Sequence, residues 1–241
     1  MKTSLALSLT AVCALALSAP VRAQVFAQWD FNSNPGDAAT GTGILTPSIG
    51  AGSLTLVGGT TSTFASGAAN GGSTDPNTTD DSGLNVTTFA AQGAENKARG
   101  VQFNVSTVGV QDISVSWDQR HSNTASEYVT FQYSTDGSTF IDFANFQGMT
   151  GDTWFNGRSV NLSAIPAVDN NASFAFRIVQ SFGPGNTYEA SNQAGSYAAA
   201  GTWRFDMVTV NATPVPEPEE YAAMVAGGLF AFAVWRRRQT R

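Results

Sequence analysis

The sequence contains little of the chemistry on which most catalytic sites depend. Its 241 residues include one cysteine and one histidine, and 12% of the residues are charged. Cys13 lies in an apolar N-terminal stretch, so the rest of the chain has no thiolate nucleophile, no cysteine-ligated metal and no disulfide. A catalytic triad would have to use His121, and no Gly-x-Ser-x-Gly motif accompanies it. We interpret His121 as a loop histidine.

Glutamate is also scarce. Before the C-terminal tail the sequence has only Glu95, Glu127 and Glu189, and none of them lies in a recognisable motif. Glycoside hydrolysis needs two carboxyl groups that flank the scissile bond. Counting does not exclude such a pair, but the sequence identifies no catalytic residue. We therefore predict that the protein is not an enzyme, and a secreted hydrolase is the least favoured alternative.

Basic residues are few between the two ends of the chain. From Gln24 to Pro216 there are 15 acidic and 6 basic residues, a net charge of −9. An acidic surface repels phosphate backbones, so we expect no nucleic-acid partner. The same charge suits a protein that holds divalent cations.

Helical periodicity is nearly absent before Tyr221, and alternation of apolar and polar residues takes its place. In the segment 25–31, apolar side chains occupy every odd position, with Gln28 and Asp30 between them. Strands with one polar face form antiparallel sheets around a shared core. Similar alternation marks residues 101–105, 113–117, 129–133 and 174–178, and residues 202–210 form the last expected strand.

These strands and their Gly/Asn/Ser-rich turns predict an all-β fold, an antiparallel two-sheet β-sandwich. A domain of roughly 190 residues is comfortable for a jelly roll. Trp29, Trp117 and Trp203 occupy expected core positions. Residues 58–83 are poor in large apolar side chains, so we expect a long surface loop there.

The N-terminus predicts a secretory signal peptide over residues 1–23. Lys2 precedes an apolar stretch, and Val21-Arg22-Ala23 places small residues before a cleavage site. We expect export by the Sec pathway, which leaves a domain from 24 to 212.

The C-terminus ends in an apolar run, Tyr221–Trp235, followed by Arg236, Arg237, Arg238 and Arg241. As a helix the run is about 22 Å long, against roughly 30 Å for the hydrocarbon core of a bilayer. We expect one short transmembrane helix, and the arginines predict a cytoplasmic C-terminus.

Pro216-Glu217-Pro218, the short Gly/Ala-rich apolar run and the arginine cluster resemble the PEP-CTERM sorting signal of exported bacterial proteins. Glu219-Glu220 departs from the Ser or Thr usual after this motif. The resemblance covers residues 213–241. It implies processing by an exosortase at the inner membrane of a Gram-negative bacterium. The domain would then reach the cell surface or a biofilm matrix rich in exopolysaccharide.

The segments "WDF", "YSTDGSTF", "NLSAIPAVDNNASFAFRIV" and "GTWRFDMVTV" resemble the jelly-roll domains that precede such tails. More distantly, they resemble carbohydrate-binding modules. That resemblance implies a structural calcium ion between the first and last strands, with Asp30 and Asp206 in the matching places. The alternative pairs Asp206 with Arg204 or Arg177 on an exposed sheet face. The acidic loop 75–81, "DPNTTDD", lacks the ligand spacing of an EF-hand, and we interpret it as a solvated turn.

Sugar binding uses flat aromatic faces with amides and carboxylates around them. Trp154, Phe155, Tyr188 and Tyr197 lie in polar, glycine-rich surroundings and are the candidate ligand-binding residues. The alternative is that these rings cap the sandwich. We expect a matrix protein that binds polysaccharide without catalysis. A structural or adhesive protein that contacts its partners through exposed strand edges remains the alternative.

Overall fold

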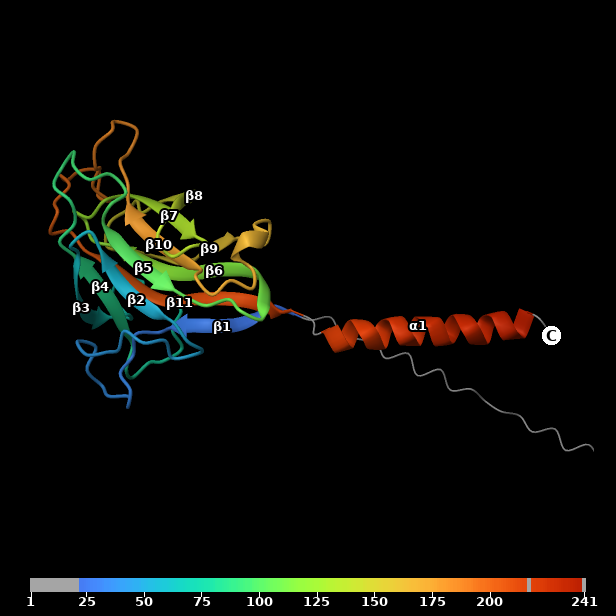
Figure 1. Ribbon diagram of the computed structural model, residues 1–241. Helices are drawn as coiled ribbons and strands as arrows, with labels where there is room; N and C mark the ends of the chain where they lie inside the picture. The colour runs from blue at the N-terminus through green and yellow to red at the C-terminus, as the bar shows by residue number, and fades with distance from the viewer. Residues whose placement is uncertain (1–21, 216–217, 240–241) are drawn as a thin grey trace, which may run out of the picture. The chain divides into compact units, whose positions relative to one another are not determined.

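The structure, a computed structural model, describes residues 22–215 and 218–239 (Figure 1). Most of the predicted signal peptide, residues 1–21, and two residues of the sorting motif, Pro216 and Glu217, lie outside the described residues. Residues Ala23–Pro214 form one compact unit, and the C-terminal segment belongs to a second unit, which is described separately.

The described part of the domain contains strands and two short 3-10 helices, η1 (Ala69–Gly71) and η2 (Pro166–Val168). The strands are β1 (Gln24–Trp29), β2 (Ser53–Val57), β3 (Thr61–Ser66), β4 (Ser82–Thr87), β5 (Gly100–Asn104), β6 (Val110–His121), β7 (Tyr128–Ser134), β8 (Ile141–Gln147), β9 (Thr153–Asn161), β10 (Ala175–Gln180) and β11 (Trp203–Pro214).

The strands form two sheets, as Figure 1 shows. The first has the order β3-β4-β11-β6-β9, with β1 also paired to β11, and the second has the order β2-β5-β10-β7-β8. Every strand pair in the described residues is antiparallel. The predicted all-β, antiparallel two-sheet sandwich is confirmed.

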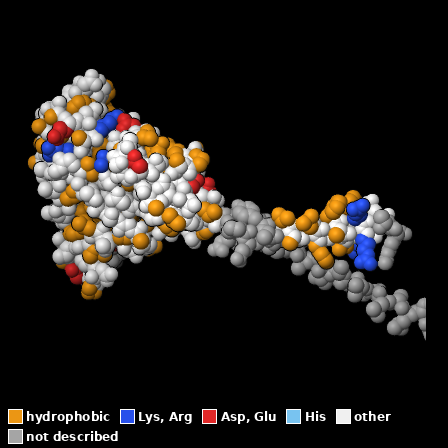
Figure 2. Space-filling model, viewed as in Figure 1, with side chains coloured by type: hydrophobic (Ala, Val, Ile, Leu, Met, Phe, Trp, Pro, Cys, Tyr) orange, Lys and Arg blue, Asp and Glu red, His pale blue; other side chains and the backbone are white. Residues whose placement is uncertain are grey.

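The alternation in the sequence places large side chains between the sheets. Trp29, Trp117 and Trp203 are at most 1% exposed, which confirms their expected core positions. Trp117 of the first sheet stacks on Phe131 of the second, with ring centroids 5.7 Å apart. Each buried ring of this kind stabilises the fold by roughly 1.5–3 kcal/mol. On the face of the domain seen in Figure 2, charged side chains are few and scattered.

One expectation about the loops is wrong. The segment 58–83 contains β3, which pairs with β4 along its whole length, and also η1. Strand β3 has one large apolar side chain, Phe64, because it lies at the edge of its sheet and buries little of its surface. Backbone pairing with β4, rather than side-chain burial, therefore holds it in place.

The C-terminal segment is a helix, α1 (Pro218–Gln239), with Arg236, Arg237 and Arg238 in its last turn. Proline is well accommodated at the start of a helix because its missing N–H has no intrahelical partner there. The predicted helix is therefore observed. Among residues 22–215 and 218–239, however, no helix is long and apolar enough to span a membrane.

Candidate functional site

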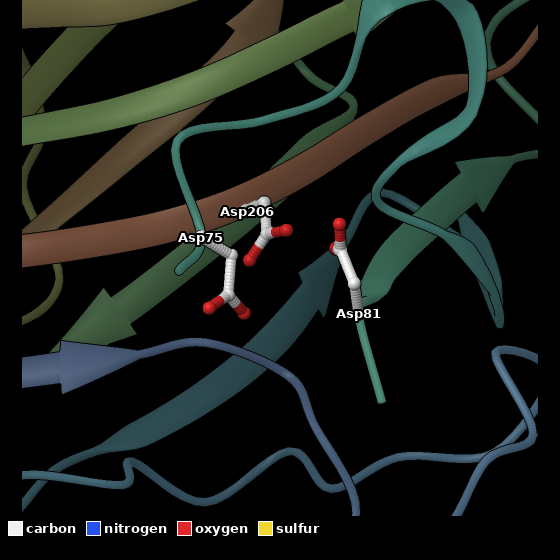
Figure 3. A group of neighbouring side chains, drawn as sticks. All are labelled: Asp75, Asp81 and Asp206. Atoms are coloured by element: carbon white, nitrogen blue, oxygen red, sulfur yellow. The ribbon is translucent and has the colours of Figure 1, made fainter. Parts of the chain in front are cut away.

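Three carboxylates converge beside β11 (Figure 3). Asp206 belongs to β11, Asp81 directly precedes β4, and Asp75 lies in the loop between η1 and β4. One oxygen from each lies within 4.8 Å of the others. We call these three residues the aspartate group.

Local hydrogen bonds hold the aspartate group in place. Ser73 donates from its hydroxyl to Asp206 Oδ2 at 2.8 Å, and Asn32 donates from Nδ2 to Asp75 Oδ2 at 2.7 Å. The backbone N–H of Asn77 donates to Asp75 Oδ1 at 2.8 Å, which closes a turn typical of Asp and Asn. The acidic loop is therefore tied to β11 and to the segment that follows β1 instead of being a freely solvated turn.

Gly67 permits the close approach of these carboxylates. A Cβ atom at this position would lie 1.7 Å from Asp81 Oδ1 and 2.7 Å from Asp206 Oδ2, well inside van der Waals contact. The site thus depends on a residue without a side chain.

The carboxylates are poorly compensated. Asp206 is fully buried and Asp81 is 7% exposed. Burial raises the pKa of Asp206 to about 9 and that of Asp81 to about 6, and neighbouring aspartate charges add to both shifts. Asp81 Oδ1 is buried without a hydrogen-bond partner in the described part of the chain. The group must therefore hold either protons or a cation.

Arg204 supplies only part of that charge: it acts to lower the pKa of Asp81, but burial outweighs it. Arg204 donates from Nη1 to the carbonyl of Ser66, and Arg177 stacks on Phe140 in the other sheet, 3.5 Å from the ring centroid. Among the described residues no ion pair involves the aspartate group. The alternative in which Asp206 pairs with an arginine on an exposed face is wrong, because Asp206 is buried.

The ligand set differs from the one expected. Asp206 belongs to the group, but Asp30 does not. Asp30 accepts a hydrogen bond from the backbone N–H of Asn32, and its charge contributes to the raised pKa of Asp75. Asp75 and Asp81, from the loop interpreted as solvated, take its place. The high density of acidic residues in this loop was the available signal.

Trp154 and Phe155 do not form an open sugar platform. Trp154 is 8% exposed, and its indole N–H donates to the carbonyl of Ala69 in η1 at 2.7 Å. Phe155 is half-buried, with the guanidinium of Arg158 4.7 Å from its ring centroid. The structure therefore corrects the expectation for Trp154, whose ring is buried, while Phe155 has Arg158 over one face and stays a prediction.

Tyr188 and Tyr197 do come together, but Tyr188 is 1% exposed, so of the two rings it is the half-buried Tyr197 that a ligand can reach. Their ring centroids lie 4.9 Å apart, at the wall of a cavity of about 490 Å³. We call this cavity the tyrosine pocket. Its lining comes from the β4–β5 and β10–β11 loops and comprises Gln92, Tyr188, Glu189, Ala190, Gln193, Gly195, Ser196 and Tyr197.

The tyrosine pocket is rigidly supported. Gln92 donates to the carbonyl of Tyr188 at 2.7 Å and accepts from its N–H at 2.9 Å. The hydroxyl of Tyr188 donates to the carbonyl of Ala94 at 2.9 Å, and that of Tyr197 to the carbonyl of Ala90 at 2.6 Å. Burial raises the pKa of Tyr188 to about 12, so its hydroxyl stays protonated. The rings are therefore fixed before any ligand arrives.

His121 is not a loop residue. It is the last residue of β6 and is fully buried, with Nδ1 2.8 Å from the carbonyl of Ser126. That bond requires a proton on Nδ1, so Nε2 accepts from Arg158 Nη1 at 3.2 Å. Burial holds the pKa of His121 well below its usual range. The ring has no access to a substrate.

Comparisons with known proteins give only remote likenesses. No family model matches the chain, and no curated protein matches it. One similar solved structure is the CBM22-1–CBM22-2 tandem domain of Paenibacillus barcinonensis Xyn10C, with 12% identity and a TM-score of 0.47 over 83% of this chain and 48% of that one.

Another is the CBM22-1–GH10 part of the Clostridium thermocellum xylanase 10B in complex with xylohexaose. It has 14% identity and a TM-score of 0.44 over 81% of this chain and 29% of that one. The chain thus spans less than half of either protein. The K1 cleaved adhesin domain of Porphyromonas gingivalis Lys-gingipain has 14% identity and a TM-score of 0.39, over 68% of this chain and 91% of that one. At these values the function must be inferred from the residues themselves.

Proposed function

We propose that the domain is a non-catalytic glycan-binding module and that the tyrosine pocket is its binding site. The observation that carries this proposal is the half-buried ring of Tyr197, which packs on the buried ring of Tyr188 and shares one cavity with amide and hydroxyl groups. Its volume, about 490 Å³, falls within the range of small-molecule sites, roughly 300–1,000 Å³. Sugar C–H groups pack on ring faces, while Gln193 and Ser196 offer hydrogen bonds to hydroxyls.

The residues around the pocket favour binding over hydrolysis. A glycosidase needs two carboxyl groups that both reach the substrate. Among the described residues that line the pocket, Glu189 is the single carboxylate. Glu127, whose charge acts with that of Glu189, is 1% exposed and has no path to a bound sugar.

A glycan array on the purified full chain tests this proposal. Gln193→Ala should weaken binding, because it removes an exposed amide from the pocket. Gln111→Ala, on β6 and outside the pocket, is the matched control and should bind as wild type. A wild-type protein that retains no glycan would instead support the structural or adhesive alternative.

We also propose that the aspartate group holds a structural calcium ion. Three carboxylate oxygens in one place are the hard ligands that calcium takes, and the buried, unpartnered Asp81 Oδ1 fits a cation. Bound there, the ion would supply positive charge and join the acidic loop to β11. The ligands would be Asp75, Asp81 and Asp206, with no part in chemistry on a substrate.

Export and sorting complete the proposal. Residues 1–23 would be removed as a Sec signal peptide, and an exosortase would process the tail at Pro216-Glu217-Pro218. The domain would then act at the cell surface or in the extracellular matrix, bound to exopolysaccharide. Mass spectrometry of the protein released by cells tests this, since a mature chain that still ends at Arg241 excludes processing.

A further inference from the structure

The tyrosine pocket contains an acidic group without a counter-charge. Glu189 lines the pocket and is half-buried. Its Oε1 packs against Gly183, where a Cβ atom would lie 2.3 Å away. Within residues 22–215 and 218–239, its carboxylate forms no hydrogen bond and no ion pair. A negative charge thus sits in the wall of the cavity with its polar contacts left to a ligand or water.

A second glutamate lies directly behind the wall. The backbone N–H of Glu127 donates to the carbonyl of Glu189 at 2.8 Å, so the two residues are neighbours across the chain. Glu127 is 1% exposed, and its Oε2 has no hydrogen-bond partner in the described part of the protein. Its side chain interacts with that of Gln193, which lines the pocket. Glu127 therefore adds a second acidic group, with one oxygen unpartnered, beneath the same surface.

The basic residues of this region are committed elsewhere. Arg99 pairs with Glu95 at 2.6 Å, and Lys97 pairs with Asp142 on β8 at 2.5 Å. No lysine or arginine is among the described residues that line the pocket. The charge of Arg99 reaches Tyr188 and Tyr197, but its pairing with Glu95 offsets it, so it competes little with a cation brought by the ligand.

We propose that the tyrosine pocket selects glycans that carry a free primary ammonium group, as 2-amino-2-deoxy sugars do. This inference rests on the proposed glycan-binding function. The ammonium group pairs with the carboxylate of Glu189, which is half-buried, through a charge-assisted hydrogen bond. The half-buried ring of Tyr197 adds attraction for a cation and for sugar C–H groups. An N-acetylated sugar brings no charge to pair, and a uronic acid is repelled.

The test is isothermal titration calorimetry of the full chain at pH 6. The probes are tetramers of β-1,4-linked glucosamine, N-acetylglucosamine and glucose. The glucosamine tetramer should bind about tenfold more tightly than either neutral tetramer, and 1 M NaCl should reduce this preference. Equal binding of all three tetramers would overturn the inference and leave glycan binding intact. If none of the three tetramers binds but another neutral glycan does, the inference is wrong and the proposed glycan-binding function stands. If no glycan binds at all, both are wrong.

Two variants locate the preference. Glu189→Gln keeps the size of the side chain and should remove the tenfold preference, measured as the ratio of the affinity for the glucosamine tetramer to the affinity for the neutral tetramers. Ser196→Asp adds a carboxylate to the pocket wall and should increase the preference. Asp112→Asn, an exposed acid on β6 outside the pocket, is the matched control and should leave it unchanged. If neither Glu189→Gln nor Ser196→Asp changes the preference, the charge of the pocket does not determine it, and the inference is wrong.

Discussion

Chelation of divalent cations is expected to destabilise the domain through the aspartate group. Calcium present at a hundredfold excess over its dissociation constant stabilises the folded state by about 2.7 kcal/mol. A domain of this size changes its melting temperature by about 2–4 °C for each kcal/mol. EDTA should therefore lower the melting temperature by about 5–11 °C, measured by differential scanning calorimetry of the full chain.

The pH dependence of stability shows whether a cation or a bound proton neutralises the aspartate group. The pKa of Asp206 is about 9 in the folded state, above the roughly 3.9 of an unfolded aspartate. Without calcium, the folded state retains a proton that the unfolded state releases. That contribution to stability is complete below pH 3.9 and is lost as the pH rises towards 9, by at most about 1.4 kcal/mol per pH unit. Calcium replaces the proton, so the calcium-loaded protein should keep its stability between pH 5 and 8.

Matched variants connect this behaviour to the site. Asp206→Asn removes a ligand and its charge. It should abolish the calcium-dependent rise in melting temperature and reduce the change of stability with pH. Asp112→Asn changes an exposed acid on β6 and should preserve both. A melting temperature that EDTA leaves unchanged at pH 5 and pH 8 refutes the reasoning. So does an Asp206→Asn protein that still responds to calcium.

Three further outcomes follow from the packing. Gly67→Ala places a methyl group against the aspartate group, so it should lower the free energy of unfolding in urea by about 1–3 kcal/mol. It should also remove the stabilisation by calcium, and an unchanged stabilisation would count against the site. Trp154→Ala should lower the free energy of unfolding by about 3–5 kcal/mol, while the folded fraction still binds glycan. A variant that loses binding but keeps its stability would show that Trp154 contacts the sugar after all. His121 has a lowered folded pKa, so its contribution to stability is complete above about pH 6.5 and falls with acidification by at most about 1.4 kcal/mol per pH unit. Urea unfolding at pH 7 and 5.5 should show a shallower decline for His121→Asn, and identical declines would exclude this histidine as the titrating group.

The fold followed from the sequence because strand periodicity is local information. Alternation in segments such as 101–105 sets which side chains face the core, and no distant residue is needed to read it. The Trp residues at 29, 117 and 203 belong to such segments, which explains why their burial was predictable.

The errors concern contacts between segments far apart in the sequence. Trp154 has polar neighbours in the chain, and its burial depends on Ala69, which lies 85 residues away. Asp75 and Asp81 become a group only because their loop folds against Asp206, more than 120 residues further on. His121 resembled a loop residue because β6 extends one residue beyond the visible pattern. Such proximity has no signature in a single sequence.

The tyrosine pocket could be predicted from the sequence only in part. Both rings were singled out because their surroundings are polar and rich in glycine, and both line the pocket. Their spacing could not be predicted, because Gln92, from a loop some 96 residues earlier, fixes the backbone of Tyr188. The signals at the two ends of the chain remain predictions, and they concern cellular routing rather than the folded domain.

Strand β11 has a mechanical consequence. The loop that carries Tyr197 leads directly into this strand, and the strand ends at Pro214, close to the proposed sorting motif. Hydrogen bonds to β6 run along most of its length, with β4 on its other side near the start and β1 near the end. Tension between a ligand at one end and a tethered tail at the other would therefore act parallel to the strand. All of its ladder bonds would have to shear together, instead of opening one at a time as they do when a strand is peeled from an edge.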